Sequence, residues 1–158
     1  MRPRPITQTT HPPAGASGKT FALAEAGRAL VLVRRIVADI VADYARVLEC
    51  QEILELQQRH GSPAVLAPVQ SDMAACVDRI QDCLVELDEI GVAFRDYTRG
   101  EVDFPARPAG RSISYSWRLD EPCVEYWRDA EDIWPAGPND PASPRRPIAE
   151  LAEALSVS

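Results

Sequence analysis

The chain has 158 residues, of which 46% are hydrophobic and 26% are charged, and its formal net charge at pH 7 is -7. This length and composition are typical of one soluble globular domain and argue against intrinsic disorder in the central part of the chain. Affinity for phosphate backbones comes mainly from Lys and Arg side chains that neutralise them. The acidic balance therefore argues against a nucleic-acid partner and against an anionic membrane as partner.

The cysteine positions match neither a metal site nor a redox motif. Cys50, Cys76, Cys83 and Cys123 include no C-x-x-C pair, so we expect no zinc ribbon, no thioredoxin-like motif, no metal and no cofactor. The N-terminal residues lack the apolar run of a secretion signal, and we therefore expect the chain in the cytoplasm. Lys19 is the only lysine among the 17 basic residues, and Ala, Arg and Pro are abundant, which suggests a bacterial genome of high GC content.

Apolar side chains recur three and four residues apart after a flexible Pro-rich leader over residues 1–19. This spacing predicts one long helix over residues 21–59, with Thr20 as its N-cap and a left-handed Gly61 at its end. The stripe consists of Leu23, Ala26, Leu30, Val33, Val37, Ile40, Tyr44, Val47, Gln51 and Leu54. Charged residues interrupt the apolar run, which excludes a membrane span. At about 1.5 Å per residue this helix is roughly 58 Å long, whereas a compact chain of this size is only about 40 Å across.

A second, shorter stripe follows a connector of about ten residues that contains Pro63 and Pro68. Ser71 or Asp72 is expected to cap its helix, which Gly91 ends. Its apolar positions are Met73, Cys76, Ile80, Cys83, Leu87 and Ile90. The matching spacing and the short link predict an antiparallel helical hairpin. Because the second helix covers only about half of the first, we expect a homodimer. The residues expected to contact the second copy are Leu30, Val33, Val37, Ile40, Tyr44, Val47 and Leu54.

From Val92 the apolar period changes from that of a helix to that of a strand. Short strands are predicted over residues 92–95, 101–105, 112–118 and 123–127, with turns between them. The predicted fold class is therefore α+β, a long coiled-coil-like antiparallel helical hairpin followed by a small antiparallel β-meander of three to four strands.

The C-terminal part of the chain is rich in proline. Residues 132–147 are predicted to form a loop that wraps the surface, and residues 148–155 a short closing helix. The expected organisation is therefore a leader over 1–19, a single domain over 20–131, and the loop with its helix over 132–158.

Several short motifs occur in the order known from one protein family. They are FALAEA at 21–26, GV at 91–92, GEVDFPA at 100–106, WRLDEP at 117–122, YW at 126–127 and RPI at 146–148. These motifs resemble those of the bacterial family catalogued as domain of unknown function 2203, over residues 20–148. The resemblance implies a helical hairpin with a small sheet, and it implies no established activity.

Two positions depart from the pattern of that family. A cysteine commonly precedes the first strand tryptophan in the family and a histidine commonly follows the second, whereas this chain has Ser116 and Arg128 there. If that Cys and His form a metal or redox site, this chain has lost it, because a hydroxyl and a guanidinium are poor metal ligands.

Polar and aromatic side chains converge on the predicted strands. In a functional interpretation, Asp103 or Glu121 is an acid–base group at a pocket. The side chains expected to bind a ligand there are Trp117, Arg118, Tyr126, Trp127 and Arg128, with Trp134 as a further aromatic. In a structural interpretation, the aromatic side chains form the core of the sheet and the charges pair across strands. Strand alternation puts Ser112, Ser114, Ser116 and Arg118 on one face, and Ile113, Tyr115 and Trp117 on the other.

Two functions fit these observations. The first is a non-catalytic homodimer that binds a small ligand or a protein partner through the sheet and the Pro-rich loop. The alternative is a small cofactor-independent enzyme of specialised metabolism that uses carboxylate acid–base catalysis in an aromatic pocket. An enclosed Asp103 or Glu121 with a raised pKa would favour the enzyme, and solvated carboxylates over a solid aromatic core would favour the binding module.

Overall fold

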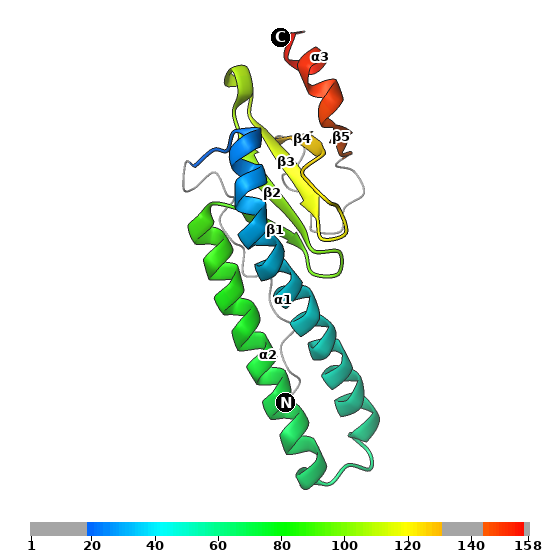
Figure 1. Cartoon of the computed structure of the whole chain (residues 1–158). Helices are drawn as coiled ribbons and strands as arrows, with labels where there is room; N and C mark the ends of the chain where they lie inside the picture. The colour runs from blue at the N-terminus through cyan, green and yellow to red at the C-terminus, as the bar shows by residue number, and fades with distance from the viewer. Residues whose placement is uncertain (1–18, 131–143, 157–158) are drawn as a thin grey trace.

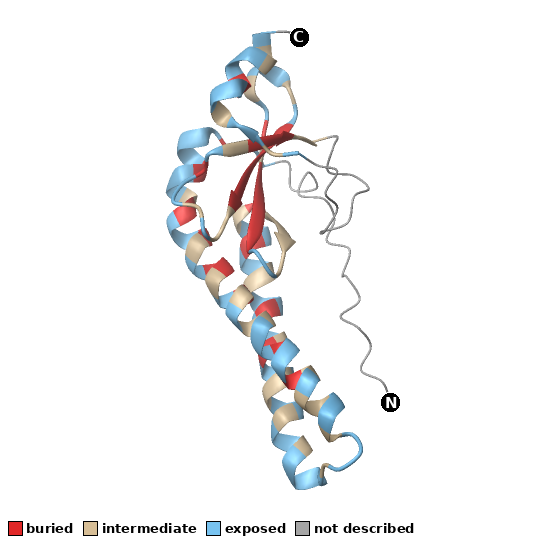
Figure 2. Ribbon diagram, turned by 90° about the vertical axis from the view of Figure 1, so that its right-hand side faces the viewer, coloured by how far each residue is buried: buried red, intermediate tan, exposed pale blue. Residues whose placement is uncertain are grey.

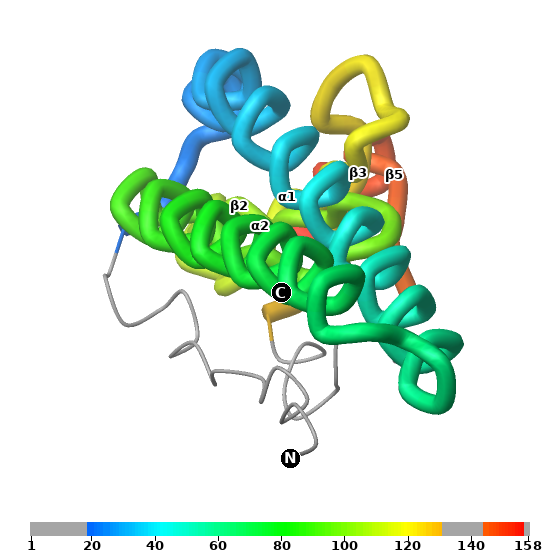
Figure 3. The backbone as a smooth tube through the Cα atoms, turned by 90° about the horizontal axis from the view of Figure 1, so that it is seen from below, coloured from blue at the N-terminus to red at the C-terminus, as the bar shows by residue number. Residues whose placement is uncertain are grey.

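The computed structural model describes residues 19–130 and 144–156 of the chain. Two long helices, α1 (Leu23–Gln57) and α2 (Pro63–Ile90), form a hairpin, and a five-stranded antiparallel sheet follows them. Figures 1 and 3 show the two helices side by side, with the sheet against one end of the hairpin. The predicted α+β class, a helical hairpin followed by an antiparallel sheet, is confirmed. The leader up to residue 18 and residues 131–143 of the predicted loop, with Trp134, lie outside the described residues.

Helix α1 differs from the prediction at both ends. Its N-cap is Ala22 rather than Thr20, and the Ala22 N–H donates to Glu25 Oε1 at 3.4 Å, so an acidic side chain of the first turn satisfies the free donor. At the other end Gly61 does not adopt the expected left-handed conformation. A Cβ at Gly61 would nevertheless lie 2.7 Å from the carbonyl oxygen of Gln57, which explains why a glycine follows the helix.

Helix α2 begins at Pro63, eight residues before the predicted cap, so the expected ten-residue connector is wrong. A proline is favourable at the first position of a helix because that position needs no N–H donor, and the helix continues through Pro68. The C-terminal prediction is confirmed, since Gly91 has φ of +95° and its N–H donates to Leu87 and Asp88.

The longer second helix and the sheet together bury much of the first stripe within a single chain. The predicted seam residues that are buried here are Leu30, Val33, Val37, Ile40 and Val47. Tyr44 and Leu54 are partly exposed, and the Tyr44 ring contacts the Tyr97 ring at 5.0 Å. The premise that α2 leaves half of α1 uncovered is therefore wrong.

Within the described residues, none of the helices combines the length and the apolar character needed to cross a bilayer.

The strands run in the order β1-β2-β3-β4-β5, each pairing with the next along the chain. Their bounds are Ala93–Asp96, Glu101–Ala106, Ile113–Arg118, Tyr126–Asp129 and Arg146–Pro147. The fourth strand begins three residues later than predicted, and the fifth was not predicted. A 3-10 turn over Ile148–Glu150 then leads into α3 (Leu151–Ser156), close to the predicted closing helix.

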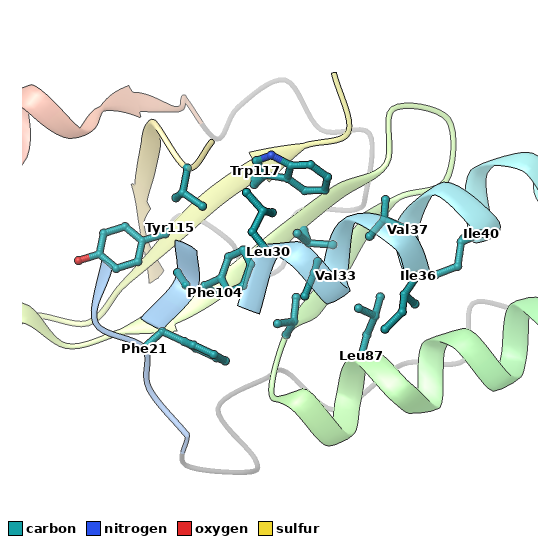
Figure 4. Close-up of a cluster of buried hydrophobic side chains, with 14 of the residues drawn as sticks. Phe21, Leu30, Val33, Ile36, Val37, Ile40, Leu87, Phe104, Tyr115 and Trp117 are labelled. Carbon is teal, nitrogen blue, oxygen red and sulfur yellow. The ribbon is translucent and has the colours of Figure 1, made fainter. Parts of the chain in front are cut away.

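The first turns of α1 pack on one face of the sheet. Phe104 on β2 and Trp117 on β3 lie beside Leu30 of α1, and Tyr115 on β3 belongs to the same buried cluster (Figure 4). Phe21, just before α1, meets Phe104 edge to face, with their ring centroids 5.3 Å apart. The central strands are almost wholly buried, whereas the far end of the hairpin is mostly exposed (Figure 2). The second face of the sheet carries polar residues instead.

Candidate functional site

The second face of the sheet carries charged residues that are buried despite their charge. The register pairs Asp103 with Ser116 and Ser114 with Arg128, so alternation puts these four side chains on one side of the sheet. The predicted division of faces along β3 is confirmed. Among these four, Asp103 is 2% exposed and Arg128 is 4% exposed. Charged side chains are rarely this buried unless they are paired, so their partners decide what the face can do.

Glu101 lies at the centre of a network of arginines. Its Oε1 accepts hydrogen bonds from Arg118 Nε at 3.1 Å, Arg128 Nη2 at 2.9 Å and Ser116 Oγ at 3.4 Å. Arg145 Nε lies 3.6 Å from the same oxygen. Strands β2, β3 and β4 and the segment before β5 therefore meet at one carboxylate.

Arg145 connects the C-terminal segment to this network. Its Nε donates to Ser116 Oγ at 2.8 Å, and its guanidinium forms a two-point ion pair with the Glu121 carboxylate. Glu121 also accepts the backbone N–H of Arg118 at 2.7 Å, which fixes the carboxylate at the end of β3. The Arg145 guanidinium lies over the Tyr126 ring at 4.2 Å. Sequence reasoning missed Arg145, because its partners lie more than twenty residues away and no local pattern links them.

Asp103 is the exception in this network. Its Oδ2 lies 3.5 Å from Arg95 Nε and its Oδ1 lies 3.8 Å from Arg128 Nε. Within the described part of the chain neither oxygen has a hydrogen-bond partner, and Arg128 Nε has none. Burial raises the pKa of Asp103, and the nearby guanidiniums of Arg128 and Arg95 only partly offset this effect.

The two predicted ligand-binding tryptophans lie on the opposite face. Trp117 and Trp127 are fully buried with the apolar side chains of the core. Trp117 Nε1 donates to the carbonyl oxygen of Glu121 at 3.0 Å, and Trp127 Nε1 to that of Pro147 at 3.2 Å. Their polar atoms are therefore satisfied by backbone. The sheet itself separates both rings from Asp103, so the structure does not bring them together with the carboxylate.

The other predicted side chains divide in the same way. Arg118 and Arg128 belong to the buried network, and Tyr126 stacks with Arg145. Glu121 reaches the network through Arg145, and within the described residues no hydrogen bond or ion pair joins it to Asp103. Among the described residues, no group of three or more His, Cys, Asp and Glu side chains is arranged to hold a metal ion. The cations of this face are guanidiniums.

A protein-family model, described as an uncharacterized conserved protein (DUF2203), matches residues 19–134 of the chain. The match covers more than half of the sequence. The chain belongs to this family. Comparison with the curated proteins and with the solved structures gave no match.

The two positions that were expected from the sequence to depart from the family pattern, Ser116 and Arg128, lie next to each other in space. Arg128 Nη2 donates to Ser116 Oγ at 3.1 Å, and both side chains are buried. Adjacent strands therefore bring Ser116 and Arg128 to one point. Here a neutral hydroxyl accepts hydrogen bonds from two guanidiniums, those of Arg128 and Arg145.

Proposed function

We propose that this chain is a non-catalytic module that binds a small anionic ligand on the polar face of its sheet. The charge of that face supports the proposal. Among the described residues its ion-pair network contains four arginines and three carboxylates, namely Arg95, Arg118, Arg128, Arg145, Glu101, Asp103 and Glu121. An excess of positive charge persists when all three carboxylates are ionised, and protonation of Asp103 increases it.

One observation carries the proposal: Asp103 and Arg128 are both buried, and both keep polar atoms without a hydrogen-bond partner among the described residues. Leaving such atoms unsatisfied costs about 1 to 3 kcal/mol each, and more for charged groups. An anion that accepts a hydrogen bond from Arg128 would relieve part of this cost. The planar guanidinium fork matches the oxygens of carboxylates and phosphates.

The proposal is tested by urea unfolding with sodium phosphate, sodium acetate or sodium sulfate added, each compared with sodium chloride at the same ionic strength. A ligand that binds only the folded state raises stability by RT ln(1 + [L]/Kd), about 2.7 kcal/mol at a hundredfold excess over Kd. We expect at least one oxyanion to stabilise the protein beyond chloride. Equal stability in all four salts would overturn the proposal.

A matched pair of variants locates the effect. Arg128→Gln should lose the stabilisation by the oxyanion, whereas Arg99→Gln, at an exposed arginine in the β1–β2 turn, should retain it. If Arg128→Gln does not fold, Arg95→Gln removes the other guanidinium next to Asp103 from a side chain that is 18% exposed. Retention of the full stabilisation by Arg95→Gln and by any folded Arg128 variant would place the anion elsewhere.

The alternative function, a small enzyme, has one observation in its favour. Asp103 is enclosed and has a raised pKa, as a general acid at neutral pH would need. The aromatic side of the predicted pocket is missing, since Trp117 and Trp127 face the other way. Turnover of 4-nitrophenyl phosphate or 4-nitrophenyl acetate that is lost in Asp103→Asn and kept in Asp120→Asn would favour the enzyme over the binding module.

Two further proposals concern the state of the protein. We propose a cytoplasmic location, supported by Cys50, Cys76, Cys83 and Cys123, which are all unpaired as in a reducing compartment. We also propose a homodimer, supported by aliphatic side chains that remain exposed on the hairpin, among them Leu48 and Leu56.

A further inference from the structure

The polar face of the sheet offers a buried donor next to buried acceptors. From this juxtaposition we infer that its ligand is an oxyanion that carries its own proton at neutral pH, namely inorganic hydrogen phosphate. The inference rests on the proposed function and goes further, because it selects one class among the anions that four arginines would attract.

The unmet hydrogen-bonding groups are of two kinds. Arg128 Nε is a donor, while Asp103 Oδ1 and Oδ2 are acceptors whenever the carboxyl is ionised. Oδ1 and Nε lie 3.8 Å apart, so a ligand that meets one also lies close to the other. A fitting ligand must therefore accept from the arginine and donate to the carboxylate.

Oxyanions differ in their ability to do both. Sulfate and acetate have only acceptor oxygens near neutral pH, so each would satisfy Arg128 and place a second negative charge beside Asp103 without a proton between them. Hydrogen phosphate has ionised oxygens for the guanidinium and one P–O–H group that donates to the Asp103 carboxylate. The proton then lies between two oxygens that would otherwise repel each other.

The surroundings of Asp103 favour this arrangement. The charged groups next to it are Arg95 on β1, Glu101 on its own strand, Arg128 on β4 and Arg145 from the C-terminal segment. Of these, only Glu101 is acidic, and its Oε1 already accepts from Arg118 and Arg128. Both oxygens of Asp103, in contrast, lack a hydrogen-bond partner among the described residues, so Asp103 is the acceptor that a ligand proton would meet. When Asp103 itself becomes protonated at lower pH, it turns into a donor, and a proton-free anion then fits as well.

The experiment compares phosphate, sulfate and phenyl phosphate as ligands of the whole wild-type chain, by urea unfolding over a range of ligand concentrations at about pH 8 and about pH 5. Phenyl phosphate is a monoester, which loses its second proton with a pKa of about 6 and is therefore proton-free at the higher pH. We expect the apparent Kd of phosphate at the higher pH to be at least about tenfold lower than that of sulfate or phenyl phosphate. The preference over sulfate should be smaller at the lower pH, because burial raises the pKa of Asp103 and so favours its protonated form.

Two variants check that Asp103 causes the selection. In Asp103→Asn the side-chain amide donates to any oxyanion, so sulfate should bind as well as phosphate at the higher pH. Asp120→Asn changes an exposed aspartate in the β3–β4 connection and should keep the tenfold preference. Loss of the preference in Asp120→Asn, or its survival in Asp103→Asn, would contradict the inference.

The wild-type measurements separate this inference from the proposed function. Equal binding of phosphate and sulfate at about pH 8, or equal binding of phosphate and phenyl phosphate there, would overturn the inference while leaving the anion site in place. Stabilisation by none of the oxyanions would overturn both.

Discussion

Neighbouring side chains on β2 and β3 belong to opposite environments. Asp103 pairs with Ser116 on the polar face, whereas Val102, the residue before it, pairs with Trp117 in the core. Because neighbouring residues of a strand point to opposite faces, the sheet itself lies between the Asp103 carboxylate and the Trp117 ring. The chemistry of the polar face therefore depends on arginines and carboxylates, with Tyr126 as the aromatic side chain that stacks on it.

Asp103 should make the stability of the protein depend on pH. Its pKa is raised above the ordinary value of 3.8, so between that pH and the folded-state pKa the folded protein holds a proton that the unfolded chain has released. The contribution of the protonated carboxyl is fully present below about pH 3.8 and is lost as pH rises through the folded-state pKa. We expect the stability of wild type relative to Asp103→Asn to fall with rising pH, by up to about 1.4 kcal/mol per pH unit. Urea unfolding of both proteins between about pH 4 and pH 8 measures this difference in the free energy of unfolding.

The comparison with Asp103→Asn isolates one group, because all other titrating residues are present in both proteins. Asp120→Asn, at an exposed position, should show the pH dependence of wild type. A wild-type to Asp103→Asn difference that stays constant over the whole pH range would show that Asp103 titrates normally.

At this scale the sequence predicts faces better than partners. The alternation along residues 113–118 predicted correctly which side chains share a side, since the period of a strand is a local property. It did not distinguish a core tryptophan from a ligand-binding one, because both fit the same alternation. The part played by Arg145 could not be predicted at all, since its contacts with Ser116 and Glu121 depend on where a distant segment returns to the sheet.

Proline positions decide how helix α2 begins. The sequence contains two prolines in the region predicted as a connector, and the structure places Pro63 at the helix start and Pro68 inside the helix. Proline is suited to the first position but removes a hydrogen bond from the interior, here the one that the carbonyl of Ala64 would accept. Prediction from sequence treated the two prolines alike, because a proline's effect depends on its position in a helix whose start was not yet known.

The substitution Pro68→Ala should therefore stabilise the protein. It restores an N–H donor within α2 and introduces the best helix former, although it also frees the unfolded chain. We expect a gain of about 1 to 2 kcal/mol in the free energy of unfolding by urea. The matched substitution Pro63→Ala, at the first helical position, should change it by no more than about 0.5 kcal/mol. Equal effects of the two substitutions would mean that Pro68 is not held in a helical turn.

The C-terminal elements are short but bind to the sheet at several points. Arg146 on β5 pairs with Trp127 on β4 and lies over its ring at 5.4 Å, and Arg111 lies over the same ring at 5.6 Å. Arg111 also donates to the carbonyl of Ala154 in α3 at 2.8 Å. A two-residue strand that contains a proline has no periodic pattern, which is why the sequence did not predict it.

At the scale of the whole molecule, the sheet covers only one end of the hairpin. Figure 1 shows both helices extending well beyond the strands, and Tyr44 on α1 contacts Tyr97 in the β1–β2 turn. Beyond that contact several aliphatic side chains are largely exposed. They are Leu48 at 47%, Leu56 at 71% and Val65 at 50%. Since most of the predicted seam residues are already buried within one chain, a second copy would use exposed side chains such as these.

We therefore expect the two copies of the predicted homodimer to contact each other at the far end of the hairpin. Light scattering at micromolar concentration should give twice the 17.4 kDa of one chain. The double variant with Leu48→Glu and Leu56→Glu should have the mass of one chain, because buried carboxylates without partners oppose association. The control is Val31→Glu, at a position that is 73% exposed near the sheet end of α1, and it should leave the mass unchanged.

The three substituted positions are exposed in one chain. The free energies of unfolding of the monomeric variants should therefore stay within about 0.5 kcal/mol of each other, so a change in mass reports association rather than folding. A wild-type mass of one chain at these concentrations would contradict the dimer, and a dimer that persists in the Leu48 and Leu56 double variant would contradict this interface.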